Sequence, residues 1–279
     1  MLNKVLGHDI IKRELLEISK NLPKVSLFCG PSGVGKKHTA FNFIDEIYGG
    51  TFSGRLTSHP DICFFEPDTK VFKIEYVHQI QEKVNLTPIE LDKRFFILKN
   101  VDKMNAESAN ACLKILEDSP KNVYFILLAE NKNNVLKTIL SRSVIFNFYP
   151  ITNLKENFPE MSELEIDLLQ GCPGSISSIK ELNVEEIYKS IEVFLDNFEK
   201  YRYSDILLWF SKVGIDLNFL IVFLYFVSLK KIKERDSSKK YFSFIKHLNL
   251  FKEKVSMSLN LDMHFKNMLI QIKQETESS

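Results

Sequence analysis

The chain has 279 residues, a length that predicts about two domains, or three small ones. Apolar residues make up 44% of the chain and charged residues 26%, which is the balance of a globular protein. With 37 basic and 36 acidic residues, the net charge of +1 excludes a general electrostatic attraction to nucleic acid or to a membrane surface.

In the first half of the chain, short apolar runs alternate with helical patterns. The runs are expected to be strands, at Val25–Cys29, Ile62–Phe65, Phe95–Leu98, Tyr124–Leu128 and Val144–Phe148. They are too uniformly apolar to alternate, which is typical of central strands covered on both faces. Helices are expected between them, at Lys37–Tyr48, Ile74–Lys83 and Asn105–Asp118. This order predicts a mostly parallel five-stranded sheet with helices on both sides.

After Pro150 the strand pattern disappears. Short helices broken by "GCPGS" (Gly171–Ser175) are expected up to about residue 185, followed by helices to the end of the chain. The apolar run "FLIVFLYFV" (Phe219–Val227) is too short to span a bilayer and predicts a buried helix that contributes to assembly. The polar stretch Lys233–Lys240 is expected to join two helices, and the tail "QETESS" is expected to be disordered.

Neither the cysteines nor the N-terminus suggests an oxidising or membrane environment. Cys29, Cys63, Cys112 and Cys172 lie far apart and form no C-x-x-C pair, so they predict small buried side chains rather than a zinc site. The first residues carry charge throughout and lack the apolar run of a signal peptide. A cytoplasmic location is therefore expected.

The stretch "SLFCGPSGVGKK" predicts a strand, a glycine-rich turn and the start of a helix. Gly30, Gly33 and Gly35 would let the backbone curl so that its N–H groups point inward, where the helix N-terminus adds positive charge. Lys36 would reach the β- and γ-phosphates of a nucleotide. The spacing G-x-x-x-x-G-K in this context therefore predicts a phosphate loop.

Two departures from the usual pattern argue against hydrolysis of nucleotide at this loop. The hydroxyl that normally follows the loop lysine ligates Mg²⁺, but here the position holds Lys37. The strand that would end in acidic residues ends instead in Lys99 and Asn100, and Asp102 lies too far along. Asp102 is expected to be a loop or helix-cap residue. We therefore predict no metal site, although the loop retains the chemistry to hold phosphate or nucleotide without metal.

Four motifs in this order resemble the delta-prime family of the bacterial DNA polymerase III clamp loader, whose members are AAA+ proteins. They are "GPSGVGKK", "HPDI" (His59–Ile62), "FFILKNVDKMNAESANACLKILEDSP" (Phe95–Pro120) and "TILSRS" (Thr138–Ser143). The stretches Lys73–Val84 and Asn260–Ile272 are also similar to helices of that family. The resemblance covers residues 1–180 well and the remainder weakly.

The resemblance implies a role for Arg142. In clamp loaders a Ser-Arg-Cys motif lies at the subunit interface, and its arginine reaches the neighbouring ATP site as an arginine finger. Arg142 occupies that position, and Ser143 departs from the cysteine of the motif. A guanidinium is permanently charged and can spread its donors over phosphate oxygens. Without the resemblance, Arg142 would be read as an exposed arginine or as a partner in an internal ion pair.

Other departures from the family separate this chain from ATP-hydrolysing subunits. The stretch Tyr48–Ser58 holds none of the four cysteines of the zinc module that family members often carry, so no zinc is expected. The stretch Pro173–Ile179 lacks the arginine that senses the γ-phosphate in active subunits. Of the histidines, His8 is expected on the surface or beside a base pocket, and "HPDI" is expected to be a turn that enters a strand rather than a catalytic His-Asp pair.

These observations predict three domains: an AAA+ α/β domain at residues 1–149, a helical lid at 150–185 and a helical collar at 186–279. The expected function is that of a non-hydrolysing clamp-loader subunit that supplies Arg142 to an adjacent ATPase subunit. Its partners would be the motor and clamp-opening subunits, with the sliding clamp and primed DNA reached through the assembly. Two alternatives remain: a clamp-loader ATPase with degenerate motifs, or a non-replicative AAA+ adaptor that binds DNA.

Overall fold

The computed structural model describes residues 1–52, 55–67, 71–234, 239–254 and 261–277. It divides into two compact units. The first comprises Met1–Met161 and Leu169–Ile176, and the second comprises Ser162–Leu168 and Ser177–Ser279. The finer separation of a lid at 150–185 from a collar at 186–279 stays a prediction.

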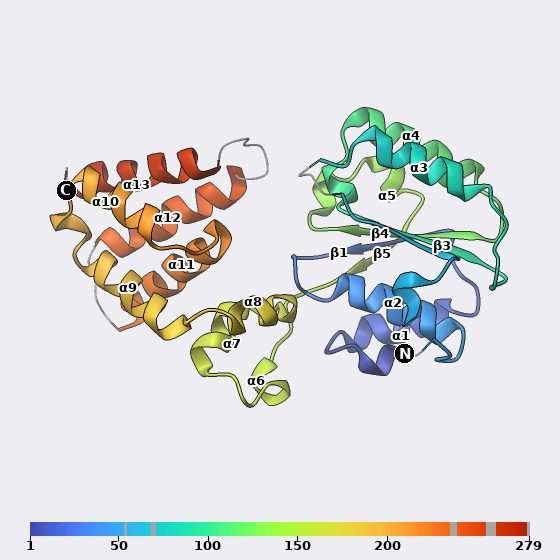
Figure 1. Cartoon of the computed structure of the whole chain (residues 1–279), viewed down its shortest axis with the longest axis horizontal. Coiled ribbons are helices and arrows are strands. Elements are labelled where there is room, and N and C mark those ends of the chain that lie inside the picture. Colours follow the sequence, from blue (N-terminus) through green and yellow to red (C-terminus); the bar gives the residue numbers. More distant parts are fainter. Residues whose placement is uncertain (53–54, 68–70, 235–238, 255–260, 278–279) are drawn as a thin grey trace. The chain divides into compact units, whose positions relative to one another are not determined.

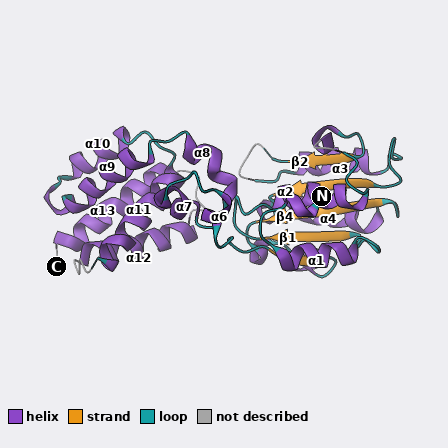
Figure 2. Ribbon diagram, turned by 90° about the horizontal axis from the view of Figure 1, so that it is seen from below, coloured by secondary structure: helices purple, strands orange, loops and turns teal. Residues whose placement is uncertain are grey.

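The first unit is built on five parallel strands in the order β2-β3-β4-β1-β5. The strands are β1 (Val25–Cys29), β2 (Ile62–Phe65), β3 (Arg94–Lys99), β4 (Val123–Ala129) and β5 (Val144–Asn147), and Figure 2 shows strands of this sheet side by side. All five predicted strands are confirmed to within one residue at either end. The apolar runs predicted them well because β1 and β4 lie in the middle of the order, where both faces are covered.

Helices cover both faces of this sheet. On one face lie α3 (Ile74–Val84), α4 (Ala106–Asp118) and the short α5 (Lys137–Leu140), and on the other lie α1 (Asp9–Ile18) and α2 (Lys36–Ile47) (Figure 1). Successive strand residues alternate between the two faces. Phe96 belongs to the core beneath α3 and α4, whereas Phe95 and Ile97 belong to the core beneath α1 and α2.

The helix α1 lies outside the predicted elements. It begins after His8, which has a left-handed backbone (φ 56°) and makes no side-chain capping bond. The Ser, Thr, Asp or Asn that usually marks a helix start is therefore absent from the N-cap position. Tertiary packing of Ile11 and Leu15, both buried, holds the helix in place.

The remaining elements of the first unit are short. They are the helix α6 (Leu154–Asn157) and the 3-10 turns η1 (Leu2–Lys4), η2 (Arg55–Ser58), η3 (Val101–Lys103), η4 (Lys132–Asn134) and η5 (Pro173–Ser175). Two helices span the boundary between the units, α7 (Glu163–Leu169) and α8 (Ile176–Lys180).

The second unit is helical throughout its described part. It contains α9 (Val184–Asp196), the turn η6 (Phe198–Lys200), α10 (Tyr203–Lys212), α11 (Leu217–Lys233), α12 (Lys239–Lys254) and α13 (Leu261–Glu277). Leu220, Phe223 and Leu224 of α11 are fully buried, which confirms that the predicted apolar helix lies in a core. The ring of Trp209 stacks on Phe194 with centroids 3.6 Å apart.

Two predictions about polar segments have different outcomes. Disorder of the tail is wrong for Gln274–Glu277, which form the last turn of α13, while Ser278 and Ser279 lie outside the described residues. The expected linker Lys233–Lys240 does separate α11 from α12, but its residues 235–238 are not described. In the described ranges, no helix combines the length and the apolar character that crossing a bilayer requires.

Candidate functional site: a phosphate loop flanked by lysines

The predicted phosphate loop lies between β1 and α2, at the carboxyl end of a central strand. It lines a hollow of about 840 Å³ within the first unit, together with residues from the end of β4 and from η5. Gly30 has room for no side chain, because a Cβ there would lie 2.3 Å from the carbonyl oxygen of Phe148. Gly33 and Gly35 both have positive φ, and Gly35 is the residue before α2. The loop therefore has the expected backbone form.

Lys36, the loop lysine, points back across the loop. Its ammonium donates to the carbonyl oxygen of Pro31 at 2.8 Å and also to that of Gly30. Burial lowers the pKa of Lys36, while the negative charges of Glu130 and Asp102 act to raise it. The ammonium thus lies against the loop carbonyls in a partly desolvated place, where an anion would stabilise its charge.

Lys37 and Lys99, the residues that replace the expected magnesium ligands, share one partner. Glu66 follows β2 directly, and its carboxylate pairs with Lys37 at 3.4 Å and with Lys99 at the end of β3. The Lys37 ammonium also lies 3.9 Å from the ring centroid of Phe64. Burial acts to raise the pKa of Glu66, but the two ammonium groups outweigh it and hold the pKa below its usual value. We call Lys37, Glu66 and Lys99 the lysine bridge.

Glu66 was not among the sequence candidates. It lies 29 residues from Lys37 and 33 from Lys99 in the chain, so no local motif joins them. The signal that could have found it is its position one residue after a predicted strand. In parallel sheets the carboxyl ends of neighbouring strands meet at one edge, and β2 pairs directly with β3.

Asp102 is a buried residue of the turn η3, in agreement with its prediction as a loop or helix-cap residue. One carboxylate oxygen accepts a hydrogen bond from the backbone N–H of Asn131 at 3.1 Å, while the other is buried without a protein partner among the described residues. Asp102 does not line the hollow. Its charge lies near Lys36, as the effect on the Lys36 pKa indicates.

The segment Pro173–Ser175 packs directly on the phosphate loop. The N–H of Gly174 donates to the carbonyl oxygen of Gly33 at 2.8 Å. A Cβ at Gly174 would lie 2.7 Å from the Cα of Gly33, so only glycine fits this close approach. The segment Pro173–Ser175, which lacks the arginine that senses the γ-phosphate in active subunits, therefore borders the phosphate loop. Ser175 also lines the hollow.

His8 occupies neither of its two expected positions fully. It is half-buried, its Nε2 donates to the carbonyl oxygen of Val34 at 2.9 Å, and its ring packs edge-on against Phe148 with centroids 4.8 Å apart. Burial lowers the pKa of His8. The His8 side chain therefore stabilises the phosphate loop through its hydrogen bond to Val34, and it does not line the hollow.

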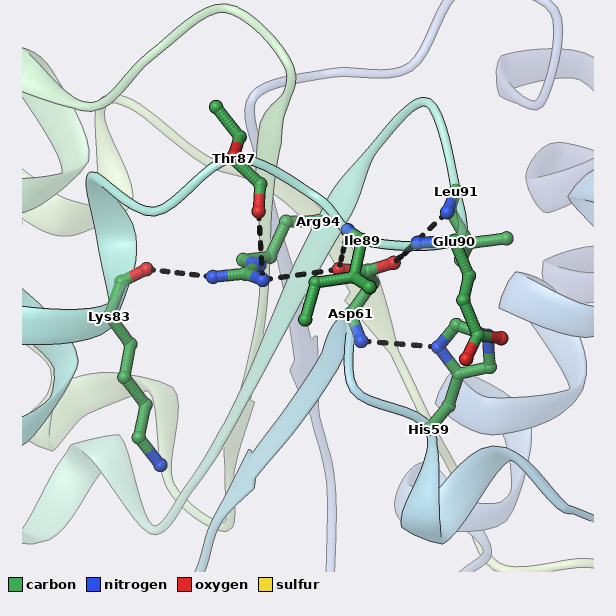
Figure 3. Close-up of polar contacts among 8 residues, drawn as sticks. All are labelled: His59, Asp61, Lys83, Thr87, Ile89, Glu90, Leu91 and Arg94. Atoms are coloured by element: carbon green, nitrogen blue, oxygen red, sulfur yellow. Dashed lines mark hydrogen bonds and ion pairs between the residues drawn. The ribbon is translucent and has the colours of Figure 1, made fainter.

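The "HPDI" motif forms a structural centre, in agreement with its prediction as a strand-entry turn. Asp61 is fully buried and accepts hydrogen bonds from the backbone N–H groups of Ile89, Glu90 and Leu91, at 2.8, 2.7 and 3.0 Å (Figure 3). It also pairs with Arg94 at 3.1 Å, and Arg94 in turn donates to the carbonyl oxygens of Lys83 and Thr87. The buried pair thus fixes the loop between α3 and β3.

Arg142 lies outside the lining of the hollow, two residues after the end of α5. Its guanidinium donates to the carbonyl oxygen of Thr138 at 3.1 Å and pairs with Glu117 of α4 at 2.6 Å. Its side chain remains 44% exposed. Both expectations from the sequence, an internal ion pair and an exposed arginine, therefore describe Arg142 in this chain. Glu117 was not among the sequence candidates.

The four cysteines are free thiols, and within the described ranges no cluster of His, Cys, Asp and Glu has the arrangement of a metal site. Burial raises the pKa of the Cys112 thiol to about 12, which makes it an inert core residue.

The fold and the loop define the class of protein. A parallel sheet in the order 2-3-4-1-5, a phosphate loop after its central β1 and an all-helical region that follows are the architecture of AAA+ proteins. The structure of a DNA polymerase III gamma subunit-related protein from Thermotoga maritima has the same fold. It aligns with 96% of this chain and 100% of its own, with a TM-score of 0.55 and 17% sequence identity.

Sequence comparison identifies the family. The profile described as "DNA polymerase III, delta subunit" matches residues 10–152, just over half of the chain. The chain belongs to the DNA polymerase III delta-prime subunit family.

Two curated relatives carry the name DNA polymerase III subunit delta′. The protein of Bacillus subtilis is 33% identical over 94 residues, which are 34% of this chain and 29% of that protein. The protein of Buchnera aphidicola is 26% identical over 166 residues, 54% of this chain and 50% of that protein. The matched part therefore spans half or less of the length of these relatives.

Proposed function

We propose that this chain is a subunit of a bacterial clamp loader that does not hydrolyse ATP and that supplies Arg142 to the ATP site of a neighbouring subunit. It would help an assembly of motor and clamp-opening subunits to place the sliding clamp on primed DNA. Membership of the delta-prime family supports the assembly, and the residues of this chain support the division of labour.

The observation that carries the proposal is the lysine bridge. Magnesium in proteins is held by oxygen atoms, and phosphoryl transfer at phosphate loops depends on that metal to neutralise developing charge. Here both positions that should provide oxygen ligands carry ammonium groups that are paired with Glu66. An ammonium group has three donors and no lone pair, so it cannot ligate a metal.

Arg142 has properties suited to a neighbouring phosphate. Its contacts with the Thr138 carbonyl, the Ser141 hydroxyl and the Glu117 carboxylate use only part of the five donors of a guanidinium. The pair with Glu117 is half-exposed on both sides, so it is weak and can exchange for a phosphate at low free-energy cost. The cation is also permanent, because arginine keeps its proton in proteins.

The decisive experiment is Arg142→Ala in the reconstituted assembly. We expect the variant to fold and to assemble, and we expect DNA-stimulated ATP hydrolysis by the assembly to fall by two orders of magnitude or more, since arginine fingers contribute ~10³-fold or more to phosphoryl transfer. Arg142→Lys keeps the charge but loses the planar fork, so its rate should fall between the two.

The matched control is Arg13→Ala on α1, which removes another exposed arginine from the same unit. It should leave hydrolysis unchanged. An Arg142→Ala assembly with the wild-type rate would eliminate the finger role. Steady ATP hydrolysis by the isolated chain, abolished by Lys36→Ala, would instead favour a clamp-loader ATPase with degenerate motifs.

A further inference from the structure

The backbone around Arg142 is held by hydrogen bonds. The N–H of Arg142 donates to the carbonyl oxygen of Ile139 at 3.1 Å, which continues the turn of α5 by two residues. The hydroxyl of Ser143 donates to the same carbonyl oxygen at 2.7 Å. Ile139 is 1% exposed and belongs to the core beneath α3 and α4. Movement of the Arg142 guanidinium therefore has to come from rotation of its side chain.

The guanidinium of Arg142 turns back onto its own segment and onto α4. One terminal nitrogen, Nη1, donates to the carbonyl oxygen of Thr138 at 3.1 Å and to the hydroxyl of Ser141 at 3.4 Å. The other terminal nitrogen, Nη2, lies 2.6 Å from Oε1 of Glu117. Both terminal nitrogens are therefore bonded within this chain.

The position of Glu117 on Nη2 matters for phosphate binding. A guanidinium grips a phosphate with two parallel N–H groups, either at its end, with Nη1 and Nη2, or along its side, with Nε and Nη2. Nη2 is common to both edges. A phosphate at either edge would therefore lie close to the Glu117 carboxylate, and the two like charges would repel each other.

Glu117 itself has a fixed position. It lies one residue before the end of α4, next to Leu116, which is 3% exposed. Just beyond the helix, the ammonium of Lys24 donates to the carbonyl oxygen of Ser119 at 3.2 Å and to that of Pro120. Lys24 directly precedes β1, so this contact ties the end of α4 to the central part of the sheet. The carboxylate is therefore held beside the guanidinium by the fold.

We propose that Glu117 is an internal competitor of phosphate for Arg142, and that their ion pair has to open before the guanidinium reaches the ATP site of a neighbouring subunit. This inference rests on the proposed function of Arg142. The two side chains are 42% and 44% exposed, and an exposed ion pair contributes at most about fivefold to an equilibrium constant. Glu117 contacts no phosphate, so it is not a catalytic residue. It sets the fraction of assemblies in which Arg142 is available, and thereby the apparent strength of its interaction with phosphate.

The test is a double-mutant cycle in the reconstituted assembly, with kcat/KM of DNA-stimulated ATP hydrolysis as the measurement. We expect Glu117→Gln, which removes the charge and keeps the size of the side chain, to raise kcat/KM by about two- to fivefold. Glu117→Asp keeps the charge on a shorter side chain, so its value should lie between those of the wild type and Glu117→Gln. In an Arg142→Ala background, Glu117→Gln should have no effect, because there is no guanidinium to release.

The matched control is Asp118→Asn. Asp118 is the next residue of α4 and is also exposed, so its substitution changes the charge at the end of the helix by the same amount. Successive residues of a helix point about 100° apart, which turns Asp118 away from the direction of Glu117. This variant should leave kcat/KM unchanged. Circular dichroism should verify that every variant is folded.

Two results would overturn the inference. A Glu117→Gln assembly with the kcat/KM of the wild type, or a lower one, would mean that the carboxylate is neutral or orients the guanidinium for its task. An equal rise of kcat/KM in the Arg142→Ala background would mean that Glu117 acts through another residue. Either result leaves the proposed function standing, since that function fails only if Arg142→Ala alone has the wild-type rate.

Discussion

The neighbouring strands β2 and β3 carry an acid–base pair at each end, and the two pairs have opposite characters. At the amino ends, Asp61 precedes β2 and pairs with Arg94, the first residue of β3. At the carboxyl ends, Glu66 follows β2 and pairs with Lys99, the last residue of β3. The strands pair in register from Ile62 with Phe95 to Phe65 with Leu98, so both ion pairs extend the same ladder.

Burial separates the two pairs. The side chains of Asp61 and Arg94 are 0% and 4% exposed, whereas those of Glu66 and Lys99 are 40% and 34% exposed. A buried charge must keep its partners, because an uncompensated charge in the interior is costly. A half-exposed charge can trade a partner for water or for a ligand. The buried pair at the amino edge of these strands therefore stabilises the fold, whereas the charged side chains at the carboxyl edge are partly exposed and can exchange partners.

The largest effect is expected from Asp61→Asn. The substitution keeps the shape but removes the charge that Arg94 and three backbone N–H groups share, so it should lower the free energy of unfolding by about 3–5 kcal/mol. Urea unfolding followed by far-ultraviolet circular dichroism measures this loss. Trp209, the single tryptophan, lies in the helical unit, and its fluorescence reports separately on that unit.

A loss below about 1 kcal/mol would mean that the Asp61–Arg94 pair is no stronger than a surface pair, and the comparison would fail. Arg94→Met serves as the reciprocal variant. It leaves the carboxylate buried with only its N–H donors, so it should also be clearly destabilising.

The pH dependence of this effect follows from the pKa of Asp61. Burial acts to raise that pKa, but hydrogen bonds from Glu90, Leu91, Ile89 and Arg94 outweigh burial and lower it. A lowered pKa in the folded state stabilises the fold fully above the unfolded value of about 4, and this stabilisation is lost as the pH falls through the folded pKa. The difference in stability between wild type and Asp61→Asn should therefore shrink as the pH is lowered from about 6 to about 3. A difference that stays constant over this range would contradict the assignment.

The smallest effect is expected from Glu66→Gln. Because Glu66 and its two lysines are between a third and a half exposed, we expect a change in unfolding free energy below about 1 kcal/mol at low salt, and less at about 1 M salt. The same urea titration measures it. A loss comparable with that of Asp61→Asn would show that both edges of the strands are structural.

Much of the α/β unit could be predicted from the sequence. Its strands are uniformly apolar runs because both faces of the sheet are covered, and helices follow them with clear periodicity. The helix α1 could not be predicted, because its N-cap position holds His8, whose side chain makes no capping hydrogen bond. The tail was predicted wrongly since its polar composition says nothing of the packing that α13 gains through Leu269 and Ile272.

The candidate site could be predicted only in part. The loop glycines, Lys36 and the two lysines that replace metal ligands are visible in local motifs. Glu66 and Glu117, which bond to Lys37, Lys99 and Arg142, are not, because only the order of strands and the packing of α4 bring them near. Sequence patterns indicate the chemical groups that a residue offers, whereas the tertiary fold determines which charged side chains lie beside it.

The backbone hydrogen bond between Gly33 and Gly174 connects the phosphate loop to a segment that follows the last strand of the sheet. A loop whose carbonyl oxygen is fastened to the N–H of residue 174 cannot change shape without displacing Pro173–Ser175 or breaking that bond. Those three residues immediately precede α8, the helix that leads into the helical unit. One backbone hydrogen bond therefore couples the conformation of the phosphate loop to the segment that precedes α8.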